Sequence, residues 1–358
     1  LTVSSDTAYY YRDKDFYKLI GSVVVTRFDA VLTCDRADYD RYLGAGDFFG
    51  NVRVEEGQTI GTGERGESRS EGRYLRLFED ALLVTPDYSV WADTIFQDRE
   101  TGDGEAFGNV RIMEPGAKNL VTGDHAVFSS EDESAEVDVN PVLTSREQDG
   151  GPLTSVAGVM RFYRAEDRVV MVDSVRIDQD QTHAKADTAV AYGQEHLVLT
   201  GAPEVSMAAT SVMKGDRIDF FYLDGQLREV VVMGNGRMED TAPDSLARIY
   251  DGLPELDVLE GDTITVELED EKISRTVVVG NARSQFTPQD LNDEVATNDV
   301  TGDTIIINFR DQEVKRVKVL GNAQGNYRFA KIAAMRELLG RSKRLVDQLA
   351  RSLSLIHI

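Results

Sequence analysis

The chain has 358 residues and a formal net charge of −24 at pH 7, because 63 acidic side chains outnumber 39 basic ones. Such an acidic surface would repel a phosphate backbone, which argues against a nucleic-acid partner. Hydrophobic residues make up 41% of the chain, enough for a core, and the single cysteine, Cys34, excludes an internal disulfide framework and a cysteine-based zinc finger.

Residues 1–148 contain a short repeat in which an aspartate precedes a turn-forming residue by a fixed interval. Asp93 precedes Asn109 by 16 residues, and Asp124 precedes Asn140 by the same interval. Asp6 stands in the same relation to Ser22. We interpret this region as the first half of a stack of β-hairpins.

The stretch Asp149-Gly150-Gly151-Pro152 is the best candidate for a joint between two halves, because its composition breaks regular structure. We therefore place the second half at residues 153–329 and expect it to continue the same stack. Two interruptions of the second half, residues 240–258 and 284–300, contain prolines and are expected to be surface loops.

The second half repeats with longer arms. Three Asp-to-Asn pairs are each 19 residues apart, namely Asp216 and Asn235, Asp262 and Asn281, and Asp303 and Asn322. Apolar residues alternate on both arms of each unit, which predicts strands with one buried and one wet face. Between the arms, Asp224-Gly225 is a strong signal for a tight hairpin turn.

The inward-facing apolar set of these hairpins is the candidate binding surface. Its members are Ile218, Phe220, Val230, Val232, Ile264, Val266, Val278, Ile305, Ile307, Val317 and Val319. Ordinary closed-core packing is the alternative role for each residue. Thr276 interrupts the alternation once.

Residues 330–352 differ from the rest, because their apolar residues recur at helical spacing. We expect an amphipathic α-helix that caps or docks, with a membrane-surface helix as the alternative. The final residues, 353–358, resemble a translated sequencing adaptor, with a genuine apolar tail as the alternative.

No pattern in the chain points to catalysis. Gly61 to Gly66 matches G-x-G-x-x-G, but the polar residues after it do not form a helical face, so we expect a mobile loop and no nucleotide. The repeated aspartates argue for a local turn or cap role, since an active site needs one constellation. We therefore name no catalytic residue, no cofactor and no metal ligand, and expect a protein that is not an enzyme.

Three segments carry a resemblance to a known family. They are ADYDRYLGAGDFFGNVRV (37–54), ADTAVAYGQEHLVLTGAPEV (186–205) and GDTITVELEDEKISRTVVVGNA (261–282). Together with the repeats over residues 1–329, they resemble the OstA-like family, which includes the periplasmic bridge protein of lipopolysaccharide transport and the N-terminal domain of its outer-membrane partner.

The resemblance implies an all-β fold, an elongated β-jellyroll of stacked antiparallel hairpins that is open along one side. It also implies non-enzymatic binding and transport of lipopolysaccharide or a similar acylated lipid across the periplasm for outer-membrane assembly. Implied partners are other OstA-like bridge proteins, joined by edge-strand addition, and the outer-membrane assembly protein. The length leaves open whether the chain is a soluble bridge or part of a larger outer-membrane protein.

Two other classes remain as alternatives. One is a structural or adhesive β-repeat protein at the cell surface, which as a parallel β-solenoid would lack tight hairpin turns. The other is a carbohydrate-active enzyme on a β-sandwich, for which no carboxylate pair can be named.

Overall fold

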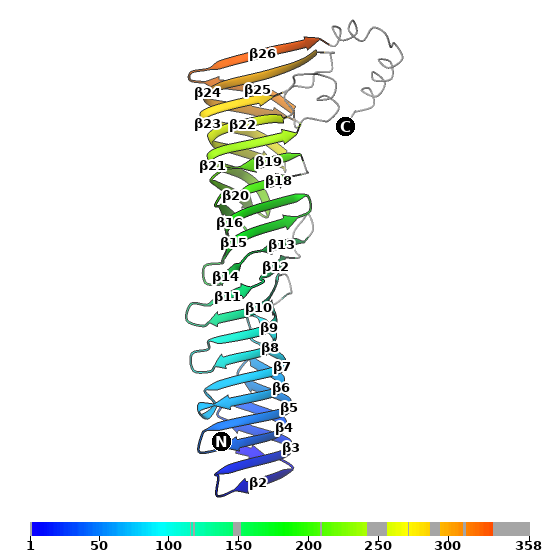
Figure 1. Cartoon of the computed structure of the whole chain (residues 1–358), viewed down its shortest axis with the longest axis vertical. Helices are drawn as coiled ribbons and strands as arrows, with labels where there is room; N and C mark the ends of the chain where they lie inside the picture. Colours follow the sequence, from blue (N-terminus) through cyan, green and yellow to red (C-terminus); the bar gives the residue numbers. More distant parts are fainter. Residues whose placement is uncertain are drawn as a thin grey trace, which may run out of the picture. The chain divides into compact units, whose positions relative to one another are not determined.

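The computed structural model describes residues 2–114, 116, 119–145, 152–207, 210–241, 256–270, 272–286, 294–310 and 313–331. Their regular structure consists of β-strands and one short 3-10 helix, and every strand pairing whose register is defined is antiparallel (Figure 1). Contacts divide the chain into two compact units, residues 1–205 and 206–358. The all-β antiparallel class expected from the sequence is therefore confirmed.

The strands of unit 1 follow one another along the chain. They are β1 (Thr2–Ser4), β2 (Thr7–Tyr11), β3 (Phe16–Arg27), β4 (Ala30–Asp40), β5 (Ala45–Glu56), β6 (Thr59–Arg69), β7 (Tyr74–Val84), β8 (Ser89–Asp98), β9 (Gly104–Met113), β10 (Asn119–Ser129), β11 (Ser134–Val139), β12 (Val142–Ser145), β13 (Leu153–Val156), β14 (Val159–Tyr163), β15 (Arg168–Gln179), β16 (Thr182–Tyr192) and β17 (His196–Thr200). The 3-10 helix η1 (Ser70–Gly72) joins β6 to β7, and β18 (Glu204–Met207) spans the boundary between the units.

The strands of unit 2 are β19 (Ser211–Lys214), β20 (Arg217–Leu223), β21 (Gln226–Thr241), β22 (Leu256–Glu269), β23 (Lys272–Phe286), β24 (Glu294–Arg310), β25 (Glu313–Leu320) and β26 (Gln324–Lys331). Unit 2 contains the longest strands, β21 to β24. Asp224 and Gly225 both have positive φ, at 52° and 76°, and join β20 to β21. The tight turn predicted at this pair is thus present.

Each long strand bends in its middle, and this bend organises the fold. Pairing along β5 shifts register between Phe49 and Val52, where Gly50 and Asn51 both have positive φ. The same shift occurs in β23 between Val279 and Ala282, at Gly280 and Asn281. Such a β-bulge turns the strand without ending it. We call this bend the corner and the two halves of each strand its arms.

Corners also explain the short strands of unit 1. β11 and β12 pair with successive parts of β10, so they are the two arms of one rung, interrupted at Asn140 and Pro141. β13 and β14 pair in the same way with β15. β12 pairs with β13, so strands on both sides of the expected joint are hydrogen-bonded. The joint itself falls on residues 146–151, outside the described residues, and the proposed halves stay a prediction.

Three sequence expectations are wrong in detail. The segments 256–258, 284–286 and 294–300, expected to be loops, are strand, because the arms continue past the corner. Gly61 to Gly66, expected to be a mobile loop, lies within β6. There the absence of a side chain allows close packing, since a Cβ at Gly63 would lie 2.8 Å from the carbonyl oxygen of Phe78.

The expected C-terminal helix can be judged only at its start. β26 extends to Lys331, so residues 330 and 331 belong to a strand. The remainder of the helix and the tail at 353–358 lie outside the described residues. No helix in the described part of the chain is long and apolar enough to cross a membrane.

Candidate functional site

The candidate site begins at the corner, where two neighbouring strands are linked by a pair of side chains. Asn281 donates a hydrogen bond from Nδ2 to Oδ1 of Asp262 over 3.1 Å, and Asn322 bonds Asp303 over 3.0 Å. The pairs 16 residues apart behave alike: Asn109 lies 3.0 Å from Asp93. The 16-residue and the 19-residue intervals are therefore the lengths of chain that separate the corners of two neighbouring strands.

The aspartate has a different partner from the one expected. We expected its side chain to bond local backbone amides, but its carboxylate accepts a hydrogen bond from the asparagine of the next strand. Its own backbone N–H donates across the same corner, as from Asp303 to the carbonyl oxygen of Gly321 over 2.9 Å. The role is thus to join corners of neighbouring strands.

Beyond the corner, the apolar residues of unit 2 form two cross-strand rows on one face. In the first row, Ile218, Val232, Ile264, Val278, Ile305 and Val319 are paired in succession from β20 to β25. In the second row, the succession is Phe220, Val230, Val266, Thr276, Ile307 and Val317. The eleven residues selected from the sequence therefore share one face.

Nine of these eleven side chains are buried. They are Ile218, Phe220, Val230, Val232, Ile264, Val266, Val278, Ile305 and Ile307. Val317 is 40% exposed and Val319 is half-buried. Both lie on β25, whose described partner is β24, so no further described rung covers them on the other side.

Thr276, which interrupts the apolar alternation in the sequence, is buried within the second row. Sequence reasoning missed another part of this interior. The other halves of these strands, which we call the second arm, form a further row. Its members, paired in succession, are Met213, Met238, Leu259, Ser284 and Val300. Three of the five, namely Leu259, Ser284 and Val300, lie in or beside segments that we interpreted as loops.

Glycines at the corner show which side of the second arm faces the interior. A Cβ at Gly261 would lie 2.4 Å from Cγ1 of Val278, a member of the first row. Gly261 therefore faces the interior, and Leu259, two residues earlier, lies on the same side. The interior of unit 2 is thus bounded by both arms of the bent strands.

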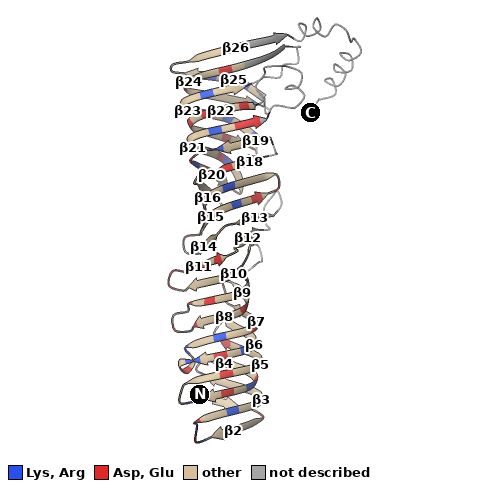
Figure 2. Ribbon diagram, in the orientation of Figure 1, with Lys and Arg blue, Asp and Glu red and all other residues tan. Residues whose placement is uncertain are grey.

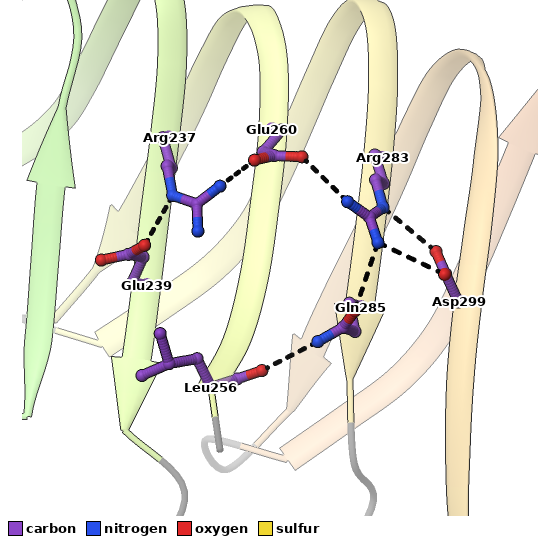
Figure 3. A network of polar contacts seen from close by, with 7 residues as sticks. All are labelled: Arg237, Glu239, Leu256, Glu260, Arg283, Gln285 and Asp299. Carbon is purple, nitrogen blue, oxygen red and sulfur yellow. Dashed lines mark hydrogen bonds and ion pairs between the residues drawn. The ribbon is translucent and has the colours of Figure 1, made fainter. Parts of the chain in front are cut away.

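The opposite face of the second arm carries a polar network (Figure 3). Arg237 of β21 pairs with Glu239 and with Glu260 of β22, and Arg283 of β23 lies 3.4 Å from Glu260. Arg283 also lies 3.2 Å from Asp299 of β24, whose carboxylate raises the pKa of the guanidinium. These alternating charges connect four strands and favour their register.

Unit 1 has an apolar interior of the same kind. Its buried cluster draws on both arms, for example Leu77 and Leu83 of β7. Cys34 belongs to the same cluster, and burial raises the pKa of its thiol to about 11. At neutral pH this thiol is protonated and is a poor nucleophile.

Basic and acidic residues are both distributed over the strands of each unit (Figure 2). Among the described residues, no three histidine, cysteine or carboxylate side chains are grouped to hold a metal ion. His125 and His183 are each paired with one carboxylate, as in the 2.6 Å contact between Nδ1 of His125 and Asp138. The candidate site is therefore the apolar interior together with the terminal strand edges.

Each unit has a strand with a described partner on one side only, and this strand exposes large side chains. β25 pairs with one arm of β24 and presents Val314, Val317 and Leu320 at 36–40% exposure. At the start of the chain, β2 pairs with β3 and exposes Tyr9, Tyr10 and Tyr11. An edge strand of this kind is a template for pairing with another chain.

Comparison with known proteins gives little further identification. No protein-family model matches the chain, and no curated protein matches it. Among solved structures, the chain is similar to LptH, the LptA-homologous periplasmic component of the lipopolysaccharide transport device from Pseudomonas aeruginosa. The identity is 14%, the match covers 32% of this chain and 82% of that one, and the TM-score is 0.30. A likeness this weak carries no functional argument.

Proposed function

We propose that the chain is a non-enzymatic lipid carrier whose interior binds the acyl chains of lipopolysaccharide or a similar lipid. The observation that carries this proposal is the pair of cross-strand apolar rows, which repeat the same interior from β20 to β25. A surface that repeats along the sheet suits a long, uniform ligand, because each bound methylene meets the same environment.

Hydrophobic transfer supplies the energy for such binding. Each acyl CH₂ moved from water to an apolar interior gains about 0.8 kcal/mol. The interaction is non-directional, so it needs no polar constellation and no cofactor. In the unliganded chain the rows are buried against their surroundings, so binding requires the arms to separate and exchanges protein contacts for lipid contacts.

The proposal extends to location and partners. We place the chain in the periplasm, where it would pass lipid toward an outer-membrane assembly protein. Bridge proteins of the same kind would attach by strand addition at the exposed edges of β2 and β25. The acidic exterior favours solubility and disfavours nucleic acid.

The alternative function, a structural or adhesive repeat protein, cannot take the form of a parallel β-solenoid. The strand pairings with defined register are antiparallel throughout the described residues, whereas a parallel β-solenoid requires neighbouring strands to run in the same direction. An antiparallel scaffold without a ligand remains as the competing function, and the test must therefore detect lipid directly.

Site-specific photocrosslinking provides that test. A benzophenone amino acid replaces Phe220 or Val266 of the interior, and the matched control replaces Val279, which is 47% exposed on the opposite face of β23. After irradiation with purified lipopolysaccharide, we expect adducts at both interior positions and none at the control. Folding of each variant is checked by circular dichroism. Absence of adducts at both interior positions in folded protein would remove the proposal.

A further inference from the structure

The hairpin tips of unit 1 form two sets that lie at opposite ends of the strands. We call the connections after β4, β6, β8 and β14 the A tips, and those after β3, β5 and β7 the B tips. Antiparallel pairing fixes this division: Arg69 pairs with Tyr74 at an A tip, and Arg27 pairs with Ala30 at a B tip. In an unbent sheet, strands of 11 residues would hold the two sets about 36 Å apart.

Three contacts nevertheless join A tips to B tips. Arg27, at the end of β3, donates a hydrogen bond from Nη1 to the carbonyl oxygen of Glu71 in η1. Arg99, after β8, lies 2.5 Å from Oε2 of Glu56, at the end of β5. Arg164, after β14, lies 2.5 Å from Asp87 in the turn between β7 and β8.

These contacts require unit 1 to fold over at its corners until the ends of its strands meet. An interior contact agrees with this geometry, since the ring of Tyr88, near a B tip, stacks on that of Phe128, near an A tip, with centroids 5.6 Å apart. At these three contacts, no backbone-to-backbone hydrogen bond of the described residues joins an A tip to a B tip. Side chains therefore close unit 1 along the line where the tips meet.

Two of the three contacts, those of Arg27 and Arg99, meet at η1. Arg99 also donates to the carbonyl oxygen of Gly72 over 3.2 Å, next to the carbonyl of Glu71 that receives Arg27. A Cβ at Gly72 would lie 3.3 Å from Nη1 of Arg27 and 3.8 Å from Nη1 of Arg99. Gly72, with φ of 96°, thus presents its backbone to both arginines.

We propose that Arg27, Arg99 and Arg164 form a seam that closes the open side of unit 1 and that must part before an apolar chain enters from the side. The role as an entry gate rests on the proposed function, whereas the closure itself does not. Side-chain exposure is 20% for Arg99 and 43% for Glu56, and it is 60% for Arg164 and 39% for Asp87. Both ion pairs are therefore in contact with solvent, so each contributes little and is weakened by salt.

The seam is tested by measuring the distance between opposite tips. Nitroxide labels are placed at Gln58→Cys, on a B tip, and at Thr101→Cys, on an A tip, in the full chain with Cys34→Ala. Gln58 and Thr101 are exposed. Double electron–electron resonance should give one narrow distance for the closed roll.

Arg99→Glu should broaden this distance distribution toward longer values. An exposed ion pair shifts an equilibrium by about 1.4-fold to 5-fold, and reversal of the charge, which turns attraction into repulsion, should raise the open fraction by about 5-fold or more. The exchange Glu56→Arg with Arg99→Glu should restore most of the narrow distance. The matched control Arg53→Glu changes the same charge at a residue that pairs with Glu55 of its own strand, and it should leave the distance unchanged.

A second readout separates the seam from the proposed function. Stopped-flow fluorescence follows uptake of N-phenyl-1-naphthylamine, an uncharged apolar probe, and its association rate should rise with the open fraction. An unchanged distance in Arg99→Glu overturns the seam, whatever the probe does. A broadened distance with an unchanged association rate overturns the gate. A broadened distance with no uptake in any variant retains the closure and removes the proposed function.

Discussion

Asn281 and Asp262 are 19 residues apart in sequence and share a hydrogen bond of 3.1 Å across the corner between β23 and β22. Asn281 itself has a φ of 49°, a conformation that asparagine tolerates better than most residues. One side chain therefore meets two demands of the corner, because it accepts the left-handed backbone and links the neighbouring strand.

Two substitutions at this corner separate its two demands. Asn281→Gly keeps the left-handed backbone and loses the hydrogen bond, so we expect a loss of about 0.5–1.5 kcal/mol in the free energy of unfolding. Asn281→Ala loses both and should cost about 1–2 kcal/mol more. Urea titration followed by circular dichroism measures both. Equal stability of the two variants would show that the backbone conformation does not matter here.

The apolar rows should dominate the stability of unit 2. Ile264 is fully buried in the first row, and Ile264→Ala removes the three side-chain carbons beyond Cβ and leaves a cavity, with an expected cost of about 2–5 kcal/mol. Val279→Ala, on the exposed face of β23, should change stability by no more than about 0.5 kcal/mol. Chemical denaturation of both variants provides the comparison. If Ile264→Ala lowered the free energy of unfolding by less than Val279→Ala, the first row would not be the packed core of unit 2.

Much of this interior could be predicted from the sequence, because alternation with period two directly reports which residues share a face. All eleven selected residues lie in the two rows, and the Asp224-Gly225 turn was identified from its composition. The 16- and 19-residue intervals were also visible, but their meaning was not. Asp and Asn are common turn residues, so the pattern alone suggested local caps and chain reversals.

Other features could not be read from the sequence. The segments 240–258 and 284–300 contain prolines, and we interpreted them as loops for that reason, although parts of them are strand. The closure of unit 1 depends on pairs such as Glu56 and Arg99, 43 residues apart. Arginine and glutamate carry no sequence signal that specifies such a distant partner, because both are common on any exposed strand.

The buried thiol of Cys34 predicts a pH dependence. Burial raises its pKa from 9.0 to about 11. Between pH 9 and pH 11 the unfolded chain releases this proton while the folded chain retains it, so the stabilising contribution is present below pH 9 and is lost as the pH rises to 11. We expect Cys34→Ala to show a smaller fall in its urea midpoint across this interval. Parallel titrations of both proteins test this, and identical pH profiles would contradict the assigned thiol pKa.

The polar network on the second arm of unit 2 should contribute modestly and in a salt-dependent way. Arg283 contacts both Glu260 and Asp299, whereas Arg275 has a single ion pair with Glu267. We expect Arg283→Met to cost up to about 1 kcal/mol in the free energy of unfolding, and Arg275→Met less. Both costs should shrink in 1 M sodium chloride, where charges are screened within about 3 Å. Salt-independent costs would point to packing of the arginine side chains instead.

The exposed edge of β25 should support association through strand addition. Val317 is 40% exposed there, while its counterparts in the second row, such as Val266, are covered by a following strand. Because Lys315, Arg316 and Lys318 already surround it, Val317→Lys would remove the apolar contact and concentrate like charge at the edge, which disfavours pairing. We expect sedimentation velocity to show concentration-dependent association of the unmodified chain and at least a several-fold weaker association of Val317→Lys. The matched variant Val279→Lys adds the same charge to the exposed face of β23, away from the edge, and should associate normally. If both variants weakened association equally, added charge and not the β25 edge would be responsible.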